Sequence, residues 1–375
     1  MSTIAVNAIT NAAGGNTATI NGMTPTADSL QGFRNRLING NMVIDQRNNG
    51  ASVTPAFDVS TFSVDRFFAY QTTDGAMTVQ QVAEAPSGFV NSVRITTTTA
   101  DTSLGATQRA IFSQRIEGTN LSDLGFGTAN AQPVTLSFWV RSSLTGTFGG
   151  ALQNGAANRS YPFSYTINAA NTWQLISVVV LGDTTGTWLT TTGIGLRVVW
   201  SLGCGSDFNG TAGAWTAAGF NSTTGAVSVI GTLNATWQIT GVQLEAGSVA
   251  TPFERRPYGT ELSLCQRYAV QLADGTNQVI ATGQCVNTSG GGGVVRFPVE
   301  MRAAPTITAS SAAHFSLTNS TGSTAAMGGT NFVFASTKSF FAEFTGRSGS
   351  GLTAGNATII FATDSAARLL ASAEL

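Results

Sequence analysis

The chain has 375 residues and a formal net charge of −1, and only 10% of its residues are charged, against about 25% in an average soluble domain. A chain of this length can form two or three domains with sizeable cores. Its near-zero charge excludes the broad positive field that nucleic-acid binding requires. The longest apolar run, 176–181, is far too short to span a bilayer, so we expect no membrane insertion.

The first 32 residues are too few to bury a core of their own. Ile4, Val6, Ile9 and Ile20 are apolar, but Gly14–Gly15 and many small polar residues interrupt them. Such a segment becomes ordered only against another surface, and the alternative is a disordered tail. The N-terminus lacks the basic leader and apolar stretch of a secretory signal peptide, so we expect synthesis and folding in a reducing cytoplasm.

Residues 33–258 contain short β-patterned runs separated by Gly, Asn, Asp, Ser and Thr, which is the pattern of a sandwich or barrel. Threonine is common in these runs, and its β-branched side chain suits a pleated surface. We therefore predict one all-β domain. Its main expected strands are 77–82, 93–98, 110–116, 134–140, 163–167, 174–180, 195–200, 226–230 and 237–244.

The remaining residues, 259–375, predict a second and smaller β domain. Residues 261–272 place Leu262 and Cys265 at helical spacing and predict a short helix. The run Gly290–Gly293 predicts a turn between two strands. The expected strands are 279–286, 294–299, 306–309, 332–334, 340–344 and 358–362.

Two long and irregular motifs indicate a family. The run from Gly241 to Tyr268, GVQLEAGSVATPFERRPYGTELSLCQRY, resembles a signature of bacteriophage tail-fibre and related virion structural proteins. Leu37–Asn41, LINGN, and Asp65–Phe68, DRFF, resemble the opening of the same family. The resemblance implies a jelly-roll β-sandwich like those of carbohydrate-binding modules. It is weak at 146–170 and 201–223, and no residue of the signature is arranged for chemistry.

The resemblance implies a virion structural protein that is assembled in the host cytoplasm and carried on the tail or the particle surface. Residues 1–32, which begin like the leader of some phage fibres, would dock on other virion proteins of the tail or baseplate. Residues 33–258 would form the jelly roll, and residues 259–375 a tip or trimerisation domain of a homotrimer. Edge strands and weakly charged faces also favour burial between chains.

Residues suited to catalysis or metal binding are scarce. The only histidine is His314, and no nucleophile elbow or pair of catalytic carboxylates can be recognised in the sequence. Cys204, Cys265 and Cys285 have spacings unlike a disulfide framework or a zinc site, so we expect buried, reduced thiols. We predict no catalytic residue, no metal site and no cofactor. Glu245 ends a strand of the signature and is expected to hold the next turn or a neighbouring subunit.

Aromatic rings are the candidate binding groups, because sugars stack their C–H faces on exposed rings. Four rings lie in or beside loop-like stretches rich in Gly, Thr and Asn, and we predict glycan contact for Trp188, Trp200, Phe208 and Trp215. The alternative for Trp188 and Trp215 is packing in the core or between subunits. Strand runs with apolar neighbours predict core positions for Trp139, Trp173 and Trp237.

The sequence thus favours a tail fibre or receptor-binding protein that projects a β-sandwich toward host surface polysaccharide. One alternative is a capsid fibre or decoration protein with no receptor role. Another is a glycan depolymerase, which would need a pair of catalytic carboxylates. A third is a free carbohydrate-binding module of a secreted enzyme, against which the missing signal peptide speaks. We expect the chain not to be an enzyme.

Overall fold

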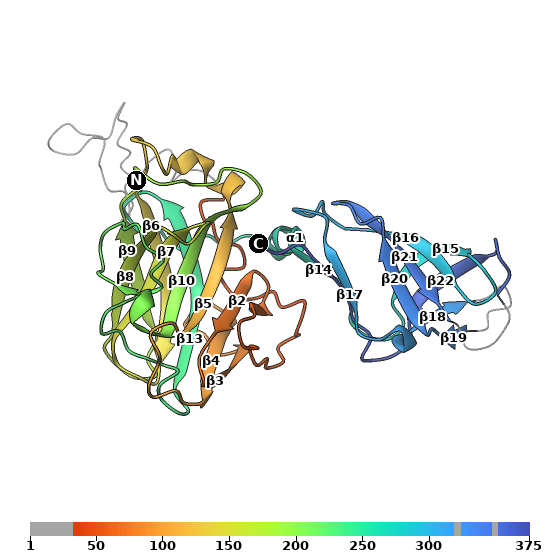
Figure 1. Cartoon of the computed structure of the whole chain (residues 1–375), viewed down its shortest axis with the longest axis horizontal. Coiled ribbons are helices and arrows are strands. Elements are labelled where there is room, and N and C mark those ends of the chain that lie inside the picture. Colours follow the sequence, from red (N-terminus) through yellow and green to blue (C-terminus); the bar gives the residue numbers. More distant parts are fainter. Residues whose placement is uncertain (1–32, 319–323, 347–351) are drawn as a thin grey trace, which may run out of the picture. The chain divides into compact units, whose positions relative to one another are not determined.

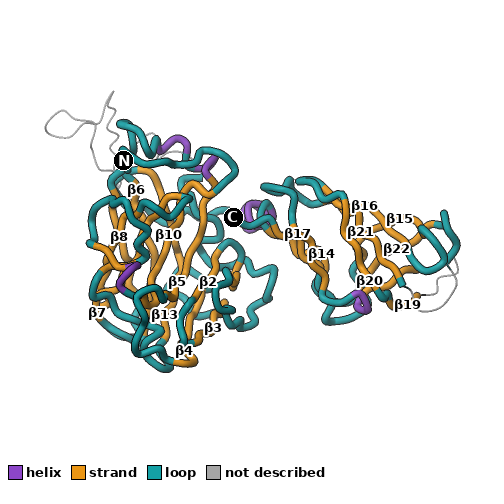
Figure 2. The backbone as a smooth tube through the Cα atoms, in the orientation of Figure 1, coloured by secondary structure: helices purple, strands orange, loops and turns teal. Residues whose placement is uncertain are grey.

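The computed structural model describes residues 33–318, 324–346 and 352–375. The expected docking segment, 1–32, therefore lies outside the described residues. The chain divides into two compact units, whose folds are traced in Figures 1 and 2. The described residues of the first unit are 33–43, 50–63 and 67–256. Those of the second are 44–49, 64–66, 257–318, 324–346 and 352–375.

The first unit is a jelly-roll sandwich of two largely antiparallel β-sheets. The six-stranded sheet has the order β1 (Thr61–Val64), β2 (Phe67–Gln71), β5 (Arg109–Glu117), β10 (Ile194–Cys204), β7 (Gly146–Asn154) and β8 (Ser160–Ile167). The five-stranded sheet has the order β3 (Ala76–Val82), β4 (Ser92–Thr99), β13 (Thr236–Ala246), β6 (Val134–Ser142) and β9 (Gln174–Val180). A short parallel pair and three 3₁₀ turns lie in the loops: β11 (Asn209–Gly210), β12 (Ser222–Thr223), η2 (Gly118–Asn120), η3 (Ser122–Leu124) and η4 (Ser206–Phe208).

Aromatic rings from both sheets fill the space between them. Phe67 and Phe112 of the six-stranded sheet stack with their ring centroids 5.4 Å apart, and Trp200 packs against both. Trp237 of the five-stranded sheet is completely buried, as predicted, and its indole nitrogen donates a hydrogen bond to the Tyr165 hydroxyl at 3.1 Å. Burial raises the pKa of Tyr165, so the phenol stays protonated as the partner of the indole.

The predicted strands of the first unit are confirmed with small shifts at their ends, except one. Residues 226–230 form a loop, although Val229 and Ile230 are buried. Their backbone makes loop hydrogen bonds, such as the one from the Ile230 amide to the Leu202 carbonyl at 2.8 Å. Strand β7 was not predicted, and it lies in the segment where the family resemblance is weak. A Cβ atom on Gly150 would lie 2.4 Å from the Phe163 ring, so the strand needs glycine there.

The second unit contains one helix, α1 (Tyr258–Gln266), among its described residues. A three-stranded sheet has the order β14 (Ala269–Ala273), β23 (Leu369–Ser372) and β17 (Thr306–Ala309). A seven-stranded sheet has the order β19 (Thr324–Ala326), β18 (Phe315–Thr318), β22 (Ala357–Ala362), β15 (Val279–Cys285), β16 (Gly291–Arg296), β21 (Ser339–Thr345) and β20 (Gly329–Val333). The turn η5 (Ala312–His314) precedes β18. The ring centroids of Phe315 in β18 and Phe344 in β21 lie 5.3 Å apart across a buried core. Three strands separate β18 from β21 in the sheet order, so this contact requires the larger sheet to be strongly curled.

Two expectations for the second unit are wrong in detail. The predicted helix 261–272 begins earlier and ends at Gln266, and the chain then enters β14. The run Gly290–Gly293 is not a turn, because Gly291–Gly293 open strand β16. A Cβ atom on Gly283 of the neighbouring strand would lie 1.9 Å from the Gly292 carbonyl oxygen. The glycines therefore allow two backbones to approach closely.

The second unit also includes segments 44–49 and 64–66, which the predicted boundary at residue 258 assigned to the sandwich. Arg47 and Arg66 from these segments form ion pairs with the buried Glu374 carboxylate. The Arg66 guanidinium also lies 3.5 Å from the centroid of the Tyr268 ring. Asp65 is buried beside them, and this burial raises its pKa to about 6, although Arg47 partly opposes the shift. The charges of this cluster hold segments far apart in sequence within one unit.

Candidate functional site

The outer face of the five-stranded sheet holds a large tryptophan. In strand β6, Leu136, Phe138 and Val140 point into the core and are completely buried. Trp139 alternates with them, so it points outward and is only half-buried. The prediction of a core position for Trp139 is therefore wrong. It is also wrong for Trp173, which is half-buried just before β9.

A β-bulge beside Trp139 shapes this face. The register of β13 on β6 shifts between Thr240 and Gln243, and Gly241 in the bulge has a φ of 61°. A Cβ atom on Gly241 would lie 2.7 Å from the ring of Phe89 and 3.0 Å from the indole of Trp139. Glycine is favoured here for two reasons, since it tolerates the left-handed backbone and leaves room for both rings.

The strand that follows the bulge fixes the loop above the sheet. Glu245 is buried, and its carboxylate accepts hydrogen bonds from the amide and the hydroxyl of Thr251 at 2.8 and 2.6 Å. The side-chain amide of Gln243 donates to Glu245 at 2.9 Å, and its oxygen accepts from the Glu254 amide at 2.7 Å. The expectation that Glu245 holds the turn is confirmed.

The segment just before the Leu37–Asn41 motif is joined to the signature run in the structure. Asn35 donates its side-chain amide to the Val242 carbonyl and accepts from the Leu244 amide, at 2.9 and 3.0 Å. The Glu254 carboxylate accepts from the amides of Arg34 and Asn35 and forms an ion pair with Arg256. The opening segment of the first unit and the end of its last strand therefore form one hydrogen-bonded support beneath the loop at 246–255.

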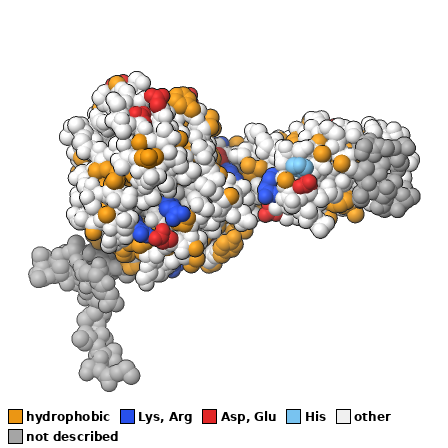
Figure 3. All heavy atoms as spheres, turned by 90° about the horizontal axis from the view of Figure 1, so that it is seen from below, with side chains coloured by type: hydrophobic (Ala, Val, Ile, Leu, Met, Phe, Trp, Pro, Cys, Tyr) orange, Lys and Arg blue, Asp and Glu red, His pale blue; other side chains and the backbone are white. Residues whose placement is uncertain are grey.

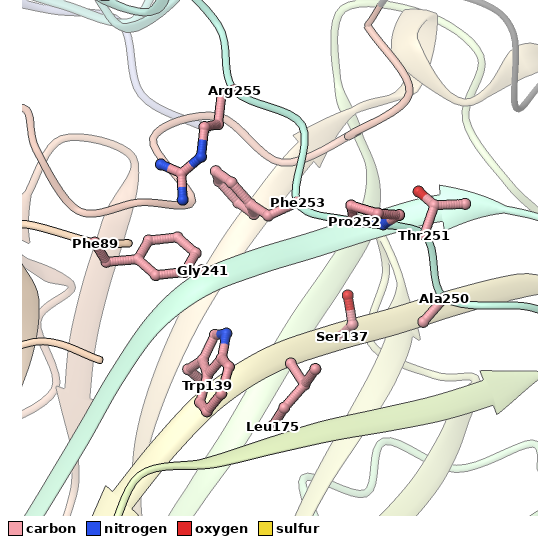
Figure 4. Close-up of a pocket in the computed structure, with 10 residues that line it drawn as sticks. All are labelled: Phe89, Ser137, Trp139, Leu175, Gly241, Ala250, Thr251, Pro252, Phe253 and Arg255. Atoms are coloured by element: carbon pink, nitrogen blue, oxygen red, sulfur yellow. The ribbon is translucent and has the colours of Figure 1, made fainter. Parts of the chain in front are cut away.

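A pocket of about 460 Å³ lies between this loop and the outer face of the sheet. It is lined by Phe89, Ser137, Trp139, Leu175, Gly241, Ala250, Thr251, Pro252, Phe253 and Arg255. In Figure 4 the indole nitrogen of Trp139 and the hydroxyl of Ser137 point toward the side of the pocket on which Phe253 and Pro252 lie. The lining thus combines aromatic faces with a few hydrogen-bonding groups.

Two phenylalanines and an arginine form one wall of the pocket. Phe89 and Phe253 meet edge to face, with their ring centroids 5.2 Å apart. The guanidinium carbon of Arg255 lies 4.8 Å from the centroid of Phe89 and 5.9 Å from that of Phe253. Cation–π contacts of this kind are individually weak but fix the orientation of an arginine. The wall is therefore aromatic on its inner side and cationic at its rim.

Beyond Trp139, the same sheet face carries a polar network. Arg141, two residues further along β6, forms an ion pair with Glu84. The side-chain amide of Gln238 donates to the Glu84 carboxylate at 3.1 Å. A guanidinium nitrogen of Arg94 lies 3.8 Å from an oxygen of the same carboxylate. The hydrogen bond from Arg141 and then that from Gln238 lower the pKa of Glu84. Polar side chains therefore extend the face on which the pocket lies.

Figure 3 shows how sparsely charged side chains are scattered over one face of the molecule.

None of the four predicted glycan-contacting residues lines this pocket. Trp200 is completely buried between the two sheets, so its ring offers no face to a sugar, and we withdraw that prediction. Trp188 and Trp215 are half-buried and pack edge to face, 5.2 Å apart. Their indole nitrogens donate to backbone carbonyls at 3.1 and 2.7 Å. Phe208 is half-buried, and the Arg109 guanidinium lies 4.2 Å from its ring centroid.

Trp188 and Trp215 belong to an aromatic cluster with Phe126 and Tyr161, which accords with the packing alternative. Glycan contact by Trp188, Phe208 and Trp215 stays a prediction. Six of the residues that line the pocket belong to the signature run: Gly241, Ala250, Thr251, Pro252, Phe253 and Arg255. The pocket was missed because the run was interpreted as purely architectural.

The thiols are poorly suited to chemistry. Cys265 and Cys285 are buried and Cys204 is half-buried, and none of the three forms a disulfide. Burial raises the pKa of Cys204 to about 12 and that of Cys265 well above its ordinary value. In the part of the chain that the structure describes, no group of three or more His, Cys, Asp or Glu side chains is arranged to hold a metal ion. No helix of that part is long and apolar enough to cross a membrane.

No protein-family profile and no curated protein sequence matches the chain. Among solved structures, it is similar to the enzymatically active domain of tailspike protein 4 from bacteriophage CBA120, with 13% identity and a TM-score of 0.30. That match covers 57% of this chain and only 22% of the tailspike chain.

The chain is also similar to the family 11 carbohydrate-binding module from Clostridium thermocellum, with 10% identity, a TM-score of 0.27, and coverage of 53% of this chain and 98% of the module. A third similar structure is TmCBM61 in complex with β-1,4-galactotriose, with 9% identity and a TM-score of 0.27. That match covers 48% of this chain and 88% of TmCBM61.

Proposed function

We propose that this chain is a structural protein of a bacteriophage particle, a tail fibre, and that its first unit binds host surface glycans at the pocket around Trp139. The observation that carries the binding role is the pocket itself. Trp139, Phe89 and Phe253 line a cavity of about 460 Å³ with Ser137 and Arg255 beside them. Sugars offer C–H faces to rings and hydroxyls to such polar groups.

The virion role is supported by the two motifs that resemble phage fibre proteins. Residues of the signature run have architectural roles, because Gly241 makes room for the aromatic rings while Glu245 and Glu254 fix the loop above them. Residues 1–32 would dock the chain on tail or baseplate proteins. A homotrimer would present several pockets at once, which turns weak single-site binding into firm attachment.

The proposed activity is binding without hydrolysis. Glycosidases generally use two carboxyl groups that flank the scissile bond. Among the described residues that line the pocket there is no Asp or Glu. The nearby carboxylates have other roles, since Glu245 holds Thr251 and Glu84 pairs with Arg141.

The binding role is tested by measuring how the full chain binds immobilised host surface polysaccharide. Replacing Trp139 with alanine should weaken binding about tenfold or more, as expected for a central aromatic anchor. Trp173→Ala is the matched control, because Trp173 is also a half-buried tryptophan but does not line the pocket. Thermal melts check that both variants are folded. Equal binding by Trp139→Ala and the unmodified chain would refute the site.

The virion role needs a separate test. Cryo-electron microscopy of whole particles should locate this subunit on the tail. Location on the shell would favour the capsid fibre or decoration protein, and absence from the particle would overturn the virion role altogether.

A further inference from the structure

Arg255 lies at the rim of the pocket and is held there by uncharged groups. Its side chain is exposed, and its guanidinium stacks beside Phe89 and Phe253, as Figure 4 shows. One nitrogen donates a hydrogen bond to the Gly88 carbonyl oxygen at 2.6 Å. A guanidinium has five N–H donors in a planar fork, so most of the donors of Arg255 remain available to a ligand.

No carboxylate neutralises Arg255 among the residues that the structure describes. The adjacent Glu254 is engaged elsewhere, since its carboxylate accepts hydrogen bonds from two backbone amides and pairs with Arg256 at 3.1 Å. The described lining of the pocket contains no acidic residue either. The pocket is therefore a locally cationic site on a chain whose net charge is −1.

We infer that the pocket prefers glycans that contain a carboxylate, such as hexuronic acid residues, and that Arg255 reads this group. The inference rests on the proposed function, because it names the ligand class of the same site. A sugar ring would stack on Trp139, and its carboxylate would face the guanidinium across the wall formed by Phe89 and Phe253. Arginine suits this role, since its planar fork pairs with both oxygens of a carboxylate.

Two features separate this arrangement from an arginine that only stabilises the fold. Arg256 and Arg141, which hold the fold, pair with Glu254 and Glu84. Arg255 instead places its charge where a ligand would enter, and its aromatic support limits the conformational freedom lost on binding. Since the site is exposed to solvent, the preference for acidic glycans should weaken as ionic strength rises.

The test uses short oligomers of galacturonic, glucuronic and mannuronic acid, each beside its methyl ester, which keeps the ring and removes the charge. Calorimetric titration of the full chain at low salt should show at least one acid bound about fivefold more tightly than its ester. Arg255→Gln should abolish this preference, so that each acid and its ester bind equally, because glutamine keeps a donor for the Gly88 carbonyl but carries no charge. Arg296→Gln, at an exposed arginine of the second unit, should keep the full preference.

The outcomes separate the inference from the proposed function. If the unmodified chain binds every acid and its ester equally, or binds only neutral host polysaccharide, the inference fails and the glycan-binding role stands. If it binds no glycan at all, both fail. If polyglutamate binds as tightly as the uronic acid oligomers and Trp139→Ala does not weaken either, charge alone is read and the inference fails.

Discussion

The glycine of the β-bulge gives the sharpest test of how the fold builds the pocket. Gly241→Ala should destabilise the first unit in two ways. The left-handed backbone, with a φ of 61°, costs a non-glycine residue about 1 kcal/mol. The new methyl group would also lie 2.7 Å from the ring of Phe89 and 3.0 Å from that of Trp139, and overpacking of this kind costs about 1–3 kcal/mol. We expect a total loss of about 2–4 kcal/mol.

Gly225→Ala is the matched control, because Gly225 also has a positive φ, 79°, but no atom lies within 4 Å of the place that its methyl group would occupy. Urea unfolding of both variants, followed by tryptophan fluorescence, should give a loss of about 1 kcal/mol for Gly225→Ala. Polysaccharide binding should weaken only in Gly241→Ala, since only this variant displaces the pocket rings. Equal losses of stability, or unchanged binding by Gly241→Ala, would show that the bulge does not shape the pocket.

Three further predictions concern the rest of the chain. Trp237→Ala should cost about 3–5 kcal/mol of unfolding free energy, because it empties a fully buried site and leaves the Tyr165 hydroxyl without its donor; a loss below about 0.5 kcal/mol, typical of surface sites, would contradict the core assignment. Residues 257–375 expressed alone should be unfolded or much less stable than the full chain in thermal melts, because Glu374 loses both arginine partners; a cooperative melt at the same temperature would refute this. Burial raises the pKa of Asp65 from 3.8 to about 6, so the folded state holds this proton more tightly than the unfolded state and the free energy of unfolding should fall by up to about 3 kcal/mol as pH rises through this window. Asp65→Asn should remove this loss, and parallel curves of unfolding free energy against pH for the variant and the unmodified chain, from pH 4 to 7, would contradict the prediction.

The strand pattern of the chain was largely predictable, and its failures have local causes. Strand β9 has the predicted bounds, Gln174–Val180, because four of its seven residues are β-branched and neither glycine nor proline interrupts it. The run 226–230 has a similar composition, but its apolar side chains enter the core from a loop. The spacing of apolar residues predicts which side chains are buried. It does not distinguish a strand from a loop whose side chains fill the core. Strand β7 shows the reverse case, since its glycines serve packing against Phe163 and do not make a turn.

The candidate site was less predictable than the fold. Phe138, Trp139 and Val140 are three consecutive apolar residues, so alternation could not tell which of the two faces the indole occupies. Phe89 and Phe253 come from loops that are far apart in sequence, and only the fold brings them together. The role of Glu245 was predictable because it belongs to a continuous motif, whereas the pocket depends on contacts between distant segments.

The central claim is that a glycan stacks on Trp139 at the outer face of the five-stranded sheet. The most direct measurement is fluorine NMR of the chain labelled with 5-fluorotryptophan and titrated with host surface oligosaccharide, with the resonances assigned from single tryptophan variants. We expect the Trp139 resonance to shift with the concentration of sugar while those of the buried Trp200 and Trp237 stay fixed. A sugar-dependent shift confined to Trp188 and Trp215, with Trp139 unchanged, would place binding elsewhere and contradict the claim.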